Sequence, residues 1–200
     1  MSLWAPVVRA ASVRSRPGPG APVVTRLPTR TPEGTANNVL VLERQERAGR
    51  LWIRARLSIL PNNRTGWVPR GVLGGYVSVN TQLLIDRRRL RATLVRAGRP
   101  VFRAPIGIGN AQWPTPAGHF YIRNRLTKYG SPFYGPVAFG TSARSAVLTD
   151  WPAGGFVGIH GTNRPDLLPG RVSHGCIRLR NEDILRLAEL MPVGTPVTIR

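Results

Sequence analysis

Turn-forming residues are the feature that most limits what this chain can fold into. The 200 residues include 19 prolines and 22 glycines, and these are spread along the whole chain. Both residue types interrupt helices and long strands, so the regular segments between them have to be short. The pattern therefore predicts many short strands joined by turns, with few long helices.

The composition also changes along the chain, which predicts a lead-in followed by two domains. Residues 1–20 are rich in Pro, Gly, Ser and Arg, and we expect them to form a flexible lead-in. Residues 21–75 hold short apolar runs separated by turn residues, a spacing typical of a small all-β barrel. These runs are Val39–Leu42, Leu51–Leu57 and Gly66–Val68. Gly74-Gly75 then marks the expected boundary with a second domain over residues 76–200.

The second domain is expected to consist of strands and one helix. Its predicted strands are Gln82–Ile85, Arg91–Arg96, Pro100–Ile108 and Val193–Ile199. A helix is predicted after residue 180, because apolar residues recur there at the i, i+3, i+4 and i+7 spacing. These residues are Ile184, Leu187, Ala188 and Met191. Asn181 is expected to cap the helix, while Glu182 and Asp183 suit the positive end of its dipole.

The charge of the chain is strongly unbalanced. It carries 29 Lys+Arg against 9 Asp+Glu, a formal net charge of +20. Such a surface attracts polyanions, so nucleic acid, anionic lipid and anionic wall polymers are all candidate partners. The arginines are dispersed rather than gathered on one stripe, so nucleic acid is not expected, and plain solvation of the arginines stays an alternative. The densest run, Arg87-Arg88-Arg89, lies at an expected hairpin turn.

The amino terminus and the cysteine content bear on location. Met1-Ser2-Leu3-Trp4 is not a charged segment followed by an apolar run, so no signal peptide is visible. We expect these residues to follow a removed signal or anchor. A single cysteine allows no intramolecular disulfide, which by itself separates neither cytosolic from exported proteins.

The chemistry of the chain is expected around that cysteine. Cys176 follows Gly175, which permits a tight turn that exposes a nucleophile. His160 and His174 lie close to it in sequence and supply imidazoles that can take the thiol proton. The N–H groups of Gly175 and Cys176 can then bind the oxyanion of a tetrahedral intermediate. Spacing alone leaves open which histidine is the base.

Other interpretations of the same residues exist. A lone cysteine is often a small buried hydrophobic residue, and His119 is expected to have a structural role. One Cys and two His could bind zinc, but the spacing of common zinc sites is missing, so no metal is expected. The chain has no phosphate-binding glycine motif either, and the sequence gives no reason to expect a cofactor.

Two segments of the second domain carry a long and specific pattern. They are Gly158-Ile159-His160-Gly161-Thr162-Asn163 and, with twelve residues between His160 and Ser173, Ser173-His174-Gly175-Cys176-Ile177-Arg178-Leu179. The pattern resembles the signature of the L,D-transpeptidase catalytic domain, a family of peptidoglycan 3→3 crosslinking enzymes. Flanking stretches agree at Thr115–Phe120, Phe133–Gly140, Asn181–Asp183 and Gly194–Val197. The resemblance spans about residues 78–200.

The resemblance implies a fold and a reaction. The fold is mostly β, a β-sandwich or barrel with one short helix after the nucleophile. Cys176 attacks the carbonyl between the third, meso-diaminopimelate-type residue and the terminal D-Ala of a tetrapeptide stem. D-Ala leaves, and an amine of a second stem resolves the thioester to give the crosslink. His160 is the implied general base, held in one tautomer by a backbone carbonyl near Gly161.

The resemblance also implies the roles of neighbouring residues. Ser173, His174 and Arg178 are expected to shape the nucleophile loop and the substrate pocket. The stretch from Tyr129 to Phe139 is expected to cover that pocket as a lid. The lid residues singled out are Tyr129, Phe133 and Tyr134.

The first domain has its own resemblance, to bacterial SH3-like wall-associated modules, carried mainly by Gly66-Trp67-Val68. An unrelated β-module with core tryptophans is the alternative. We expect an extracytoplasmic monomer, in the cell wall or periplasm, that acts on peptidoglycan stems and is a target of carbapenems. Two alternatives remain: an L,D-carboxypeptidase that uses water as acceptor, and an inactive wall-binding module.

Overall fold

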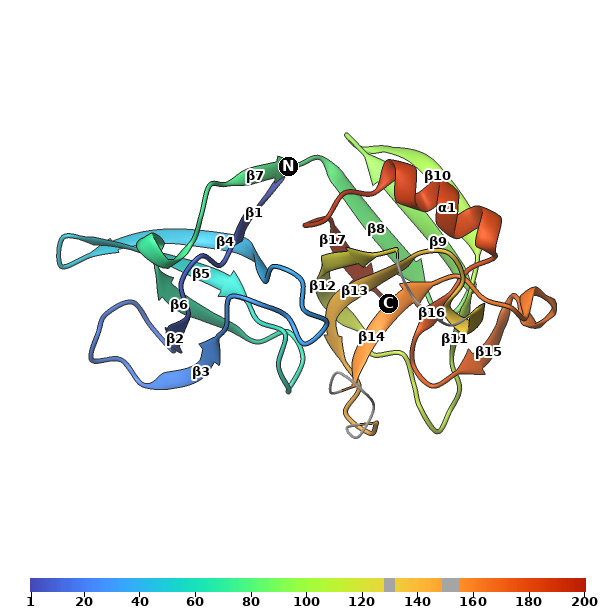
Figure 1. Ribbon diagram of the computed structural model, residues 1–200, viewed down its shortest axis with the longest axis horizontal. Helices are drawn as coiled ribbons and strands as arrows, with labels where there is room; N and C mark the ends of the chain where they lie inside the picture. Colours follow the sequence, from blue (N-terminus) through green and yellow to red (C-terminus); the bar gives the residue numbers. More distant parts are fainter. Residues whose placement is uncertain (128–131, 149–154) are drawn as a thin grey trace.

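The fold consists of two β-sheets that follow one another along the chain (Figure 1). The computed structural model describes residues 1–127, 132–148 and 155–200. The first sheet has seven strands and the second has ten, and most of these strands are short. The prediction of a mostly β chain cut into short segments is confirmed. Among the described residues, no helix has the length and apolarity to cross a membrane.

The seven-stranded sheet has the order β3-β2-β6-β5-β4-β1-β7. Its strands are β1 (Ser2–Pro6), β2 (Ala11–Arg14), β3 (Val23–Leu27), β4 (Asn38–Arg47), β5 (Arg50–Arg56), β6 (Thr65–Pro69) and β7 (Val77–Val79), with a 3-10 turn η1 (Arg70–Val72). Alternate side chains of these strands point inward, and Val13, Ile53, Ala55 and Val68 are fully buried in a core of their own. The three apolar runs expected to be strands form β4, β5 and β6.

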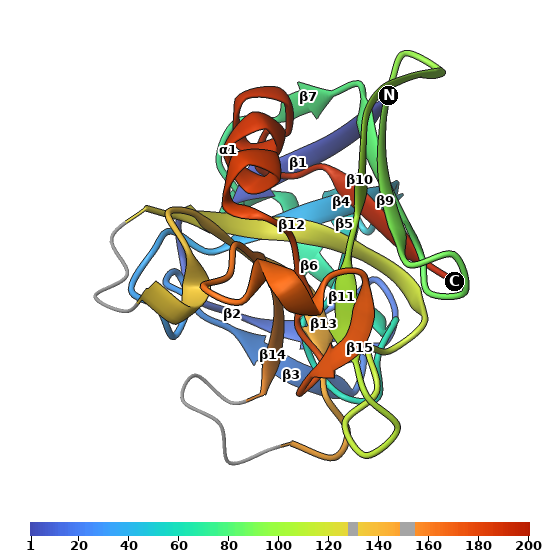
Figure 2. The same cartoon turned by 90° about the vertical axis from the view of Figure 1, so that its right-hand side faces the viewer.

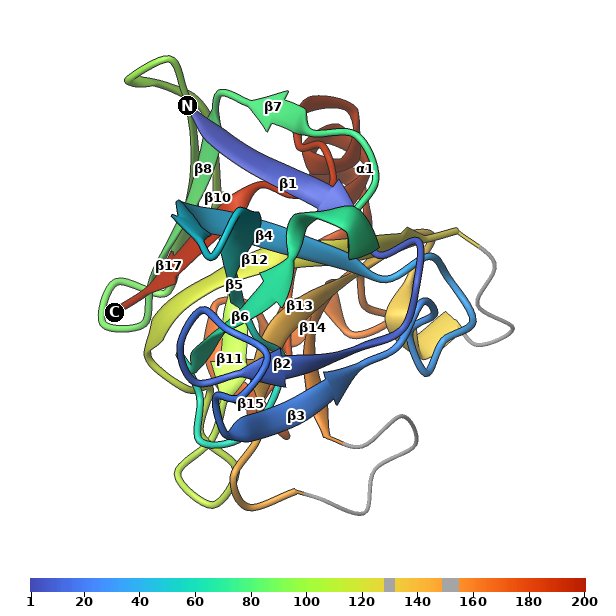
Figure 3. The ribbon, with the colours of Figure 1, turned by 90° about the vertical axis from the view of Figure 1, so that its left-hand side faces the viewer.

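The expectation of a flexible lead-in over residues 1–20 is wrong. Residues Ser2–Pro6 pair with β4 on one side and with β7 on the other (Figure 3). Residues Ala11–Arg14 pair with β3 and β6. Backbone pairing to strands far along the chain thus orders a segment whose local composition favours disorder. Because β7 belongs to this sheet, the change from one sheet to the other falls between Val79 and Thr81, a few residues after the expected boundary at Gly74-Gly75.

The ten-stranded sheet has the order β10-β9-β8-β17-β12-β13-β14-β16-β11-β15. Its strands are β8 (Thr81–Asp86), β9 (Arg91–Arg96), β10 (Arg99–Pro105), β11 (Gly107–Gly109), β12 (Gly118–Leu126), β13 (Ala138–Arg144), β14 (Phe156–His160), β15 (Gly170–Ser173), β16 (Ile177–Arg178) and β17 (Pro196–Ile199). The 3-10 turns η2 (Pro132–Tyr134) and η3 (Pro165–Leu167) interrupt it. The predicted run Pro100–Ile108 divides into β10 and β11, which lie at different places in the sheet, and β11 lies beside β15 (Figure 2).

The predicted helix is present as α1 (Asn181–Leu190). Ile184, Leu187 and Ala188 are buried in the core of the ten-stranded sheet, as their spacing predicts. Its capping was predicted wrongly, because Asn181 is the first residue of the helix and Arg180 holds the cap position without a side-chain cap hydrogen bond. The Asn181 side chain instead accepts a hydrogen bond from the N–H of Thr162 at 2.9 Å.

The two sheets contact each other through buried polar groups rather than through a shared apolar core. Arg123 on β12 is 2% exposed and forms an ion pair of 2.8 Å with Glu33, from the connection between β3 and β4. The Tyr121 hydroxyl, also on β12, donates to the carbonyl of Asn38 at 2.9 Å. Arg123 and Tyr121 are thus buried where the two halves meet, and the loss of either partner would leave a buried polar group unsatisfied.

Candidate active site

Cys176 lies in a tight turn between β15 and β16 that is held by its own residues. The Ser173 hydroxyl donates to the Cys176 carbonyl at 2.6 Å and accepts from the Gly175 N–H at 3.1 Å. Gly175 has φ of +111°, a conformation that L side chains rarely adopt, so glycine is required there. Ser173 is 1% exposed and is not among the residues that line the pocket, so it supports the turn from the protein interior.

A second support of this turn was missed by the sequence analysis. The Thr115 hydroxyl donates to the Gly175 carbonyl at 2.8 Å and accepts from the Gly109 N–H at 2.9 Å. Thr115 is 1% exposed, and it ties the Cys176 turn to β11. Its partner lies 60 residues away in sequence, so no local pattern could have revealed this contact.

His160 ends β14 and is 2% exposed. Its Nδ1 lies 2.6 Å from the carbonyl oxygen of Gly161. A carbonyl only accepts, so Nδ1 carries the proton and Nε2 is left with its lone pair. Burial lowers the pKa of His160 to about 4, against the partial opposing effect of the Gly161 hydrogen bond. The imidazole is therefore neutral near pH 7.

The loop after His160 is fixed from the helix. Asn181 Oδ1 accepts from the N–H of Thr162, and it lies where a side chain at Gly161 would have to go, 2.3 Å from an added Cβ. The Gly161 N–H donates to the carbonyl of Val137 at 3.4 Å. Gly161 thus has a positioning role, since its carbonyl sets the His160 tautomer and its missing side chain leaves room for Asn181.

The Cys176 sulfur accepts a hydrogen bond from the Gly158 N–H at 3.3 Å. Gly158 adjoins both side chains, because an added Cβ there would lie 3.8 Å from the Cys176 sulfur and 3.8 Å from a ring carbon of His160. Burial raises the pKa of the Cys176 thiol, while the Gly158 N–H and the Arg178 charge oppose that rise. In the free protein the two groups thus meet as a neutral thiol and a neutral imidazole.

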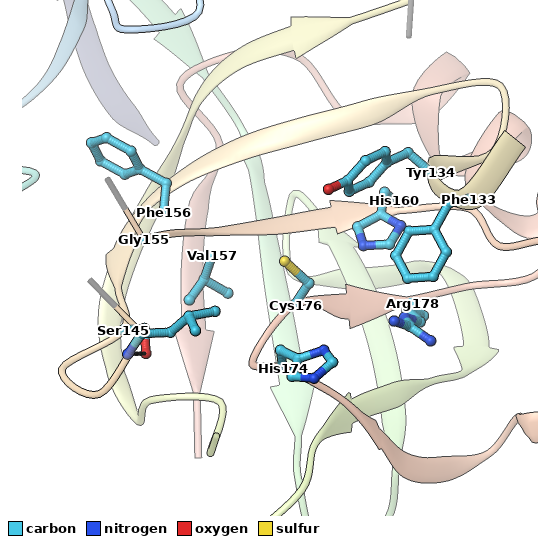
Figure 4. Close-up of a pocket in the computed structure, with 11 residues that line it drawn as sticks. Phe133, Tyr134, Ser145, Gly155, Phe156, Val157, His160, His174, Cys176 and Arg178 are labelled. Atoms are coloured by element: carbon cyan, nitrogen blue, oxygen red, sulfur yellow. Dashed lines mark hydrogen bonds between the residues drawn. The ribbon is translucent and has the colours of Figure 1, made fainter. Parts of the chain in front are cut away.

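Cys176, His160, His174 and Arg178 line one pocket (Figure 4). The other lining residues are mostly apolar: Phe133, Tyr134, Ser145, Leu148, Gly155, Phe156 and Val157. His174 is exposed, and its ring packs against Trp113 with centroids 4.2 Å apart. Trp113 was not singled out from the sequence.

Two of the three expected lid residues contact the site. The Tyr134 ring meets the His160 ring edge-on, with centroids 4.9 Å apart. The guanidinium carbon of Arg178 lies over the Phe133 ring, 4.7 Å from the ring centroid. Burial raises the pKa of the Tyr134 hydroxyl. Tyr129 lies outside the described residues.

The structure does not support one of the expected oxyanion donors, and it places His119 outside the pocket. The Gly175 N–H already donates to Ser173, so it is not available as the oxyanion donor that the sequence analysis expected. His119, on β12, is exposed, does not line the pocket, and has Nδ1 at 3.3 Å from the Thr198 hydroxyl.

The ten-stranded half matches a known protein family. The family model described as the L,D-transpeptidase catalytic domain matches residues 80–199, more than half of the chain. The chain belongs to the L,D-transpeptidase catalytic-domain family. The match begins at the start of the ten-stranded sheet and contains every described residue of the pocket.

Individual relatives carry the same family name. YkuD of Bacillus subtilis, named as an L,D-transpeptidase, is 39% identical over 107 residues, which cover 54% of this chain and 58% of that protein. YbiS of Escherichia coli K12, also named as an L,D-transpeptidase, is 59% identical over 138 residues, covering 60% of this chain and 44% of that protein. The chain therefore spans about half the length of these two relatives.

The fold is also similar to that of a solved structure. An L,D-transpeptidase from Mycobacterium tuberculosis H37Rv superposes with a TM-score of 0.52 at 16% identity, covering 82% of this chain and 90% of that one. At this identity the likeness bears on the fold alone.

Proposed function

We propose that this chain is a cysteine-dependent L,D-transpeptidase of cell-wall biogenesis that forms 3→3 crosslinks between peptidoglycan stems. The observation that carries the proposal is the arrangement around Gly158. The Cys176 sulfur and the buried, neutral imidazole of His160 adjoin this residue from two sides and face one pocket. A thiol with a neighbouring base of fixed tautomer is the arrangement that nucleophilic acyl transfer requires.

In the first half of the reaction, Nε2 of His160 takes the thiol proton of Cys176. The sulfur then attacks the carbonyl carbon between the third stem residue and the terminal D-Ala, and the carbonyl oxygen becomes an oxyanion. The intermediate collapses as the C–N bond breaks, and the imidazolium returns its proton to the leaving D-Ala amine. The product is a thioester on Cys176.

In the second half, an amine of another stem attacks the thioester. It gives a proton to His160, the C–S bond breaks, and that proton returns to the sulfur. The proposed general base is His160 rather than His174, because His160 has a fixed tautomer and is neutral near pH 7. The His174 ring packs on Trp113 but stays exposed to solvent, so this side chain is suited to contact the substrate.

The charges of the intermediates need partners. Burial raises the pKa of the Cys176 thiol, and the Arg178 charge opposes that rise, so it favours the thiolate as it forms. With the Gly175 N–H occupied, we assign the oxyanion to the N–H of Cys176. This donor sits in a turn fixed by Ser173 and Thr115, so it needs no rearrangement during the reaction.

The substrate sets the expected location and partners. Peptidoglycan stems lie outside the cytoplasmic membrane, so the proposed site of action is the cell wall or periplasm. The net charge of +20 supports an added attraction to anionic wall polymers. The seven-stranded half is proposed to be the SH3-like module that contributes to this attachment.

Incubation with disaccharide-tetrapeptide muropeptides, followed by mass spectrometry, tests the proposal. The expected products are free D-Ala and crosslinked dimers. Cys176→Ala should abolish both while the melting temperature stays unchanged, because the thiol is needed only for the covalent step. Trimmed tripeptides without dimers would point to water as the acceptor, and near-normal turnover by Cys176→Ala would refute the mechanism.

A further inference from the structure

A second cleft lies where the two sheets meet. Its walls come from the seven-stranded half, through β3, the β3–β4 connection and the end of β5, and from β12, β13 and β14 of the other half. It holds about 860 Å³, including its open mouth. Neither the reaction proposed above nor the family pattern uses this cleft.

Arginine dominates the lining of this interdomain cleft, and no acidic side chain is among its described lining residues. The arginines are Arg26, Arg30, Arg56, Arg123 and Arg144. Arg123 is neutralised by Glu33 at 2.8 Å. Within the described part of the chain, Arg26, Arg30 and Arg56 form no ion pair with an acidic side chain. The cleft therefore concentrates positive charge between low-dielectric walls, which strengthens its attraction for an anion.

Arg56, at the end of β5, carries the strongest sign of a missing partner. Its Nη1 donates to the Asn63 carbonyl at 3.0 Å, but its Nε is buried and has no hydrogen-bond partner among the described residues. Burial, together with the charge of Arg54, lowers the pKa of Arg56. A buried donor without an acceptor is costly, and a shift of the guanidinium towards an anionic oxygen in the cleft would remove that cost.

The cleft adjoins the catalytic pocket through one residue. Phe156, at the start of β14, lines both, and its ring points away from the Cys176 sulfur (Figure 4). On the cleft side, Arg123 and Arg144 pack over this ring, with their guanidinium carbons 3.8 and 4.6 Å from its centroid. The two cavities thus share a wall residue, and a chain bound at Cys176 would pass Phe156 to reach the arginine cleft.

We propose that the interdomain cleft binds carboxylate groups of a peptidoglycan stem peptide whose other end reaches the Cys176 pocket. Guanidinium groups match carboxylates with paired hydrogen bonds, and Arg26 and Arg56 supply them from the seven-stranded half. Continuity with the reaction centre favours the substrate itself over a separate phosphate-bearing polymer. This inference rests on the proposed function for the identity of the peptide.

The test measures binding without turnover. All variants are made in the Cys176→Ala protein, and calorimetry gives the Kd of a stem tetrapeptide and of the same peptide with its internal carboxylates converted to amides. The carboxylate form should bind the parent about tenfold or more tightly than the amide form, as expected for charged hydrogen bonds. Arg56→Gln and Arg26→Gln should each reduce this preference by about threefold or more.

The matched control is Arg103→Gln. It removes the same charge from an exposed position on β10, at the far edge of the ten-stranded sheet, and should leave the preference unchanged. Because Arg26 is exposed, its variant keeps the test valid even if Arg56→Gln unfolds.

Several results would overturn the assignment. One is an unchanged preference in the well-folded Arg26→Gln protein, and another is an equal loss in Arg103→Gln, which would indicate net charge alone. If Arg26→Gln and Arg56→Gln lost affinity for a glycerol-phosphate polymer while their affinity for the peptide stayed unchanged, the cleft would be assigned to that polymer instead. Failure of the Cys176-containing protein to release D-Ala would count against the proposed function, and it would leave the binding result standing.

Discussion

The two halves of the molecule are built in different ways, and the difference separates the chemistry from what surrounds it. Among the described residues, the ten-stranded half holds the proposed reaction centre with its own hydrogen bonds. The residues that make them are Thr115, Gly158, Gly161, Ser173 and Asn181. No described residue of the seven-stranded half lines the Cys176 pocket. That half contacts the ten-stranded half through paired polar groups such as Glu33 and Arg123. Substitutions in the seven-stranded half should therefore act on stability and binding, whereas substitutions around Cys176 should act on the rate.

The largest expected effect is on the rate. Replacing His160 by Gln removes the proposed base and should lower kcat/KM for D-Ala release by about two to four decades, as loss of a general base does. His119→Gln, an exposed change on the same half, should stay close to the parent rate. If His174→Gln proved more harmful than His160→Gln, the two imidazoles would have exchanged roles.

A large effect on stability alone is expected at the interface. Glu33→Gln leaves the Arg123 charge buried without its counter-charge, which should lower the free energy of unfolding by about 3 kcal/mol. Chemical denaturation measures this loss. The rate per folded molecule should change little, and Glu43→Gln, which breaks the exposed pair with Arg54, is the control. A large loss of rate in a still-folded Glu33→Gln protein would contradict the separation of the two halves.

Acid should reveal the buried histidine. Burial lowers the pKa of His160 from 6.5 to about 4, so between these values the unfolded chain binds a proton that the folded protein does not. The resulting stability is fully present above pH 6.5 and is lost as the pH falls towards 4, by about 3 kcal/mol from this residue. Denaturation curves at pH 7 and pH 4 should show that component in the parent and lack it in His160→Gln. If the two proteins lost the same free energy of unfolding between pH 7 and pH 4, the loss could not be attributed to His160.

A smaller effect joins rate and stability. Thr115→Val keeps the shape of the side chain but leaves the Gly175 carbonyl and the Gly109 N–H without their buried partner. We expect a loss of about 2 kcal/mol in the free energy of unfolding, and a lower rate because the nucleophile turn loosens. Thr115→Ser keeps the hydroxyl and should restore the rate. No recovery in the Ser variant would show that the methyl group, and not the hydrogen bonds, supports the turn.

Local patterns predicted the elements that local forces stabilise. The stripe of Ile184, Leu187 and Ala188 is buried as its period requires, and the glycine before Cys176 occupies a left-handed turn. The sequence motif predicted Cys176 and His160 as site residues, and both line one pocket in the structure. Their roles stay predictions until they are tested.

Long-range contacts account for what the sequence did not predict. The partner of Thr115 lies 60 residues away, and Asn181 binds a backbone N–H 19 residues earlier instead of capping its own helix. The amino-terminal residues have the composition of a linker, yet pairing with β4 and β7 makes Ser2–Pro6 a strand. In each case a distant partner, rather than local preference, decides the outcome.

The central claim is that Cys176 forms a covalent acyl-enzyme, and intact-protein mass spectrometry with a carbapenem tests it most directly. One adduct per chain is expected, located on Cys176 by peptide mapping. Labelling should be much slower in His160→Gln, unchanged in His119→Gln, and absent in Cys176→Ala. An adduct that persists in Cys176→Ala, or an unlabelled parent that releases D-Ala at its normal rate, would contradict it.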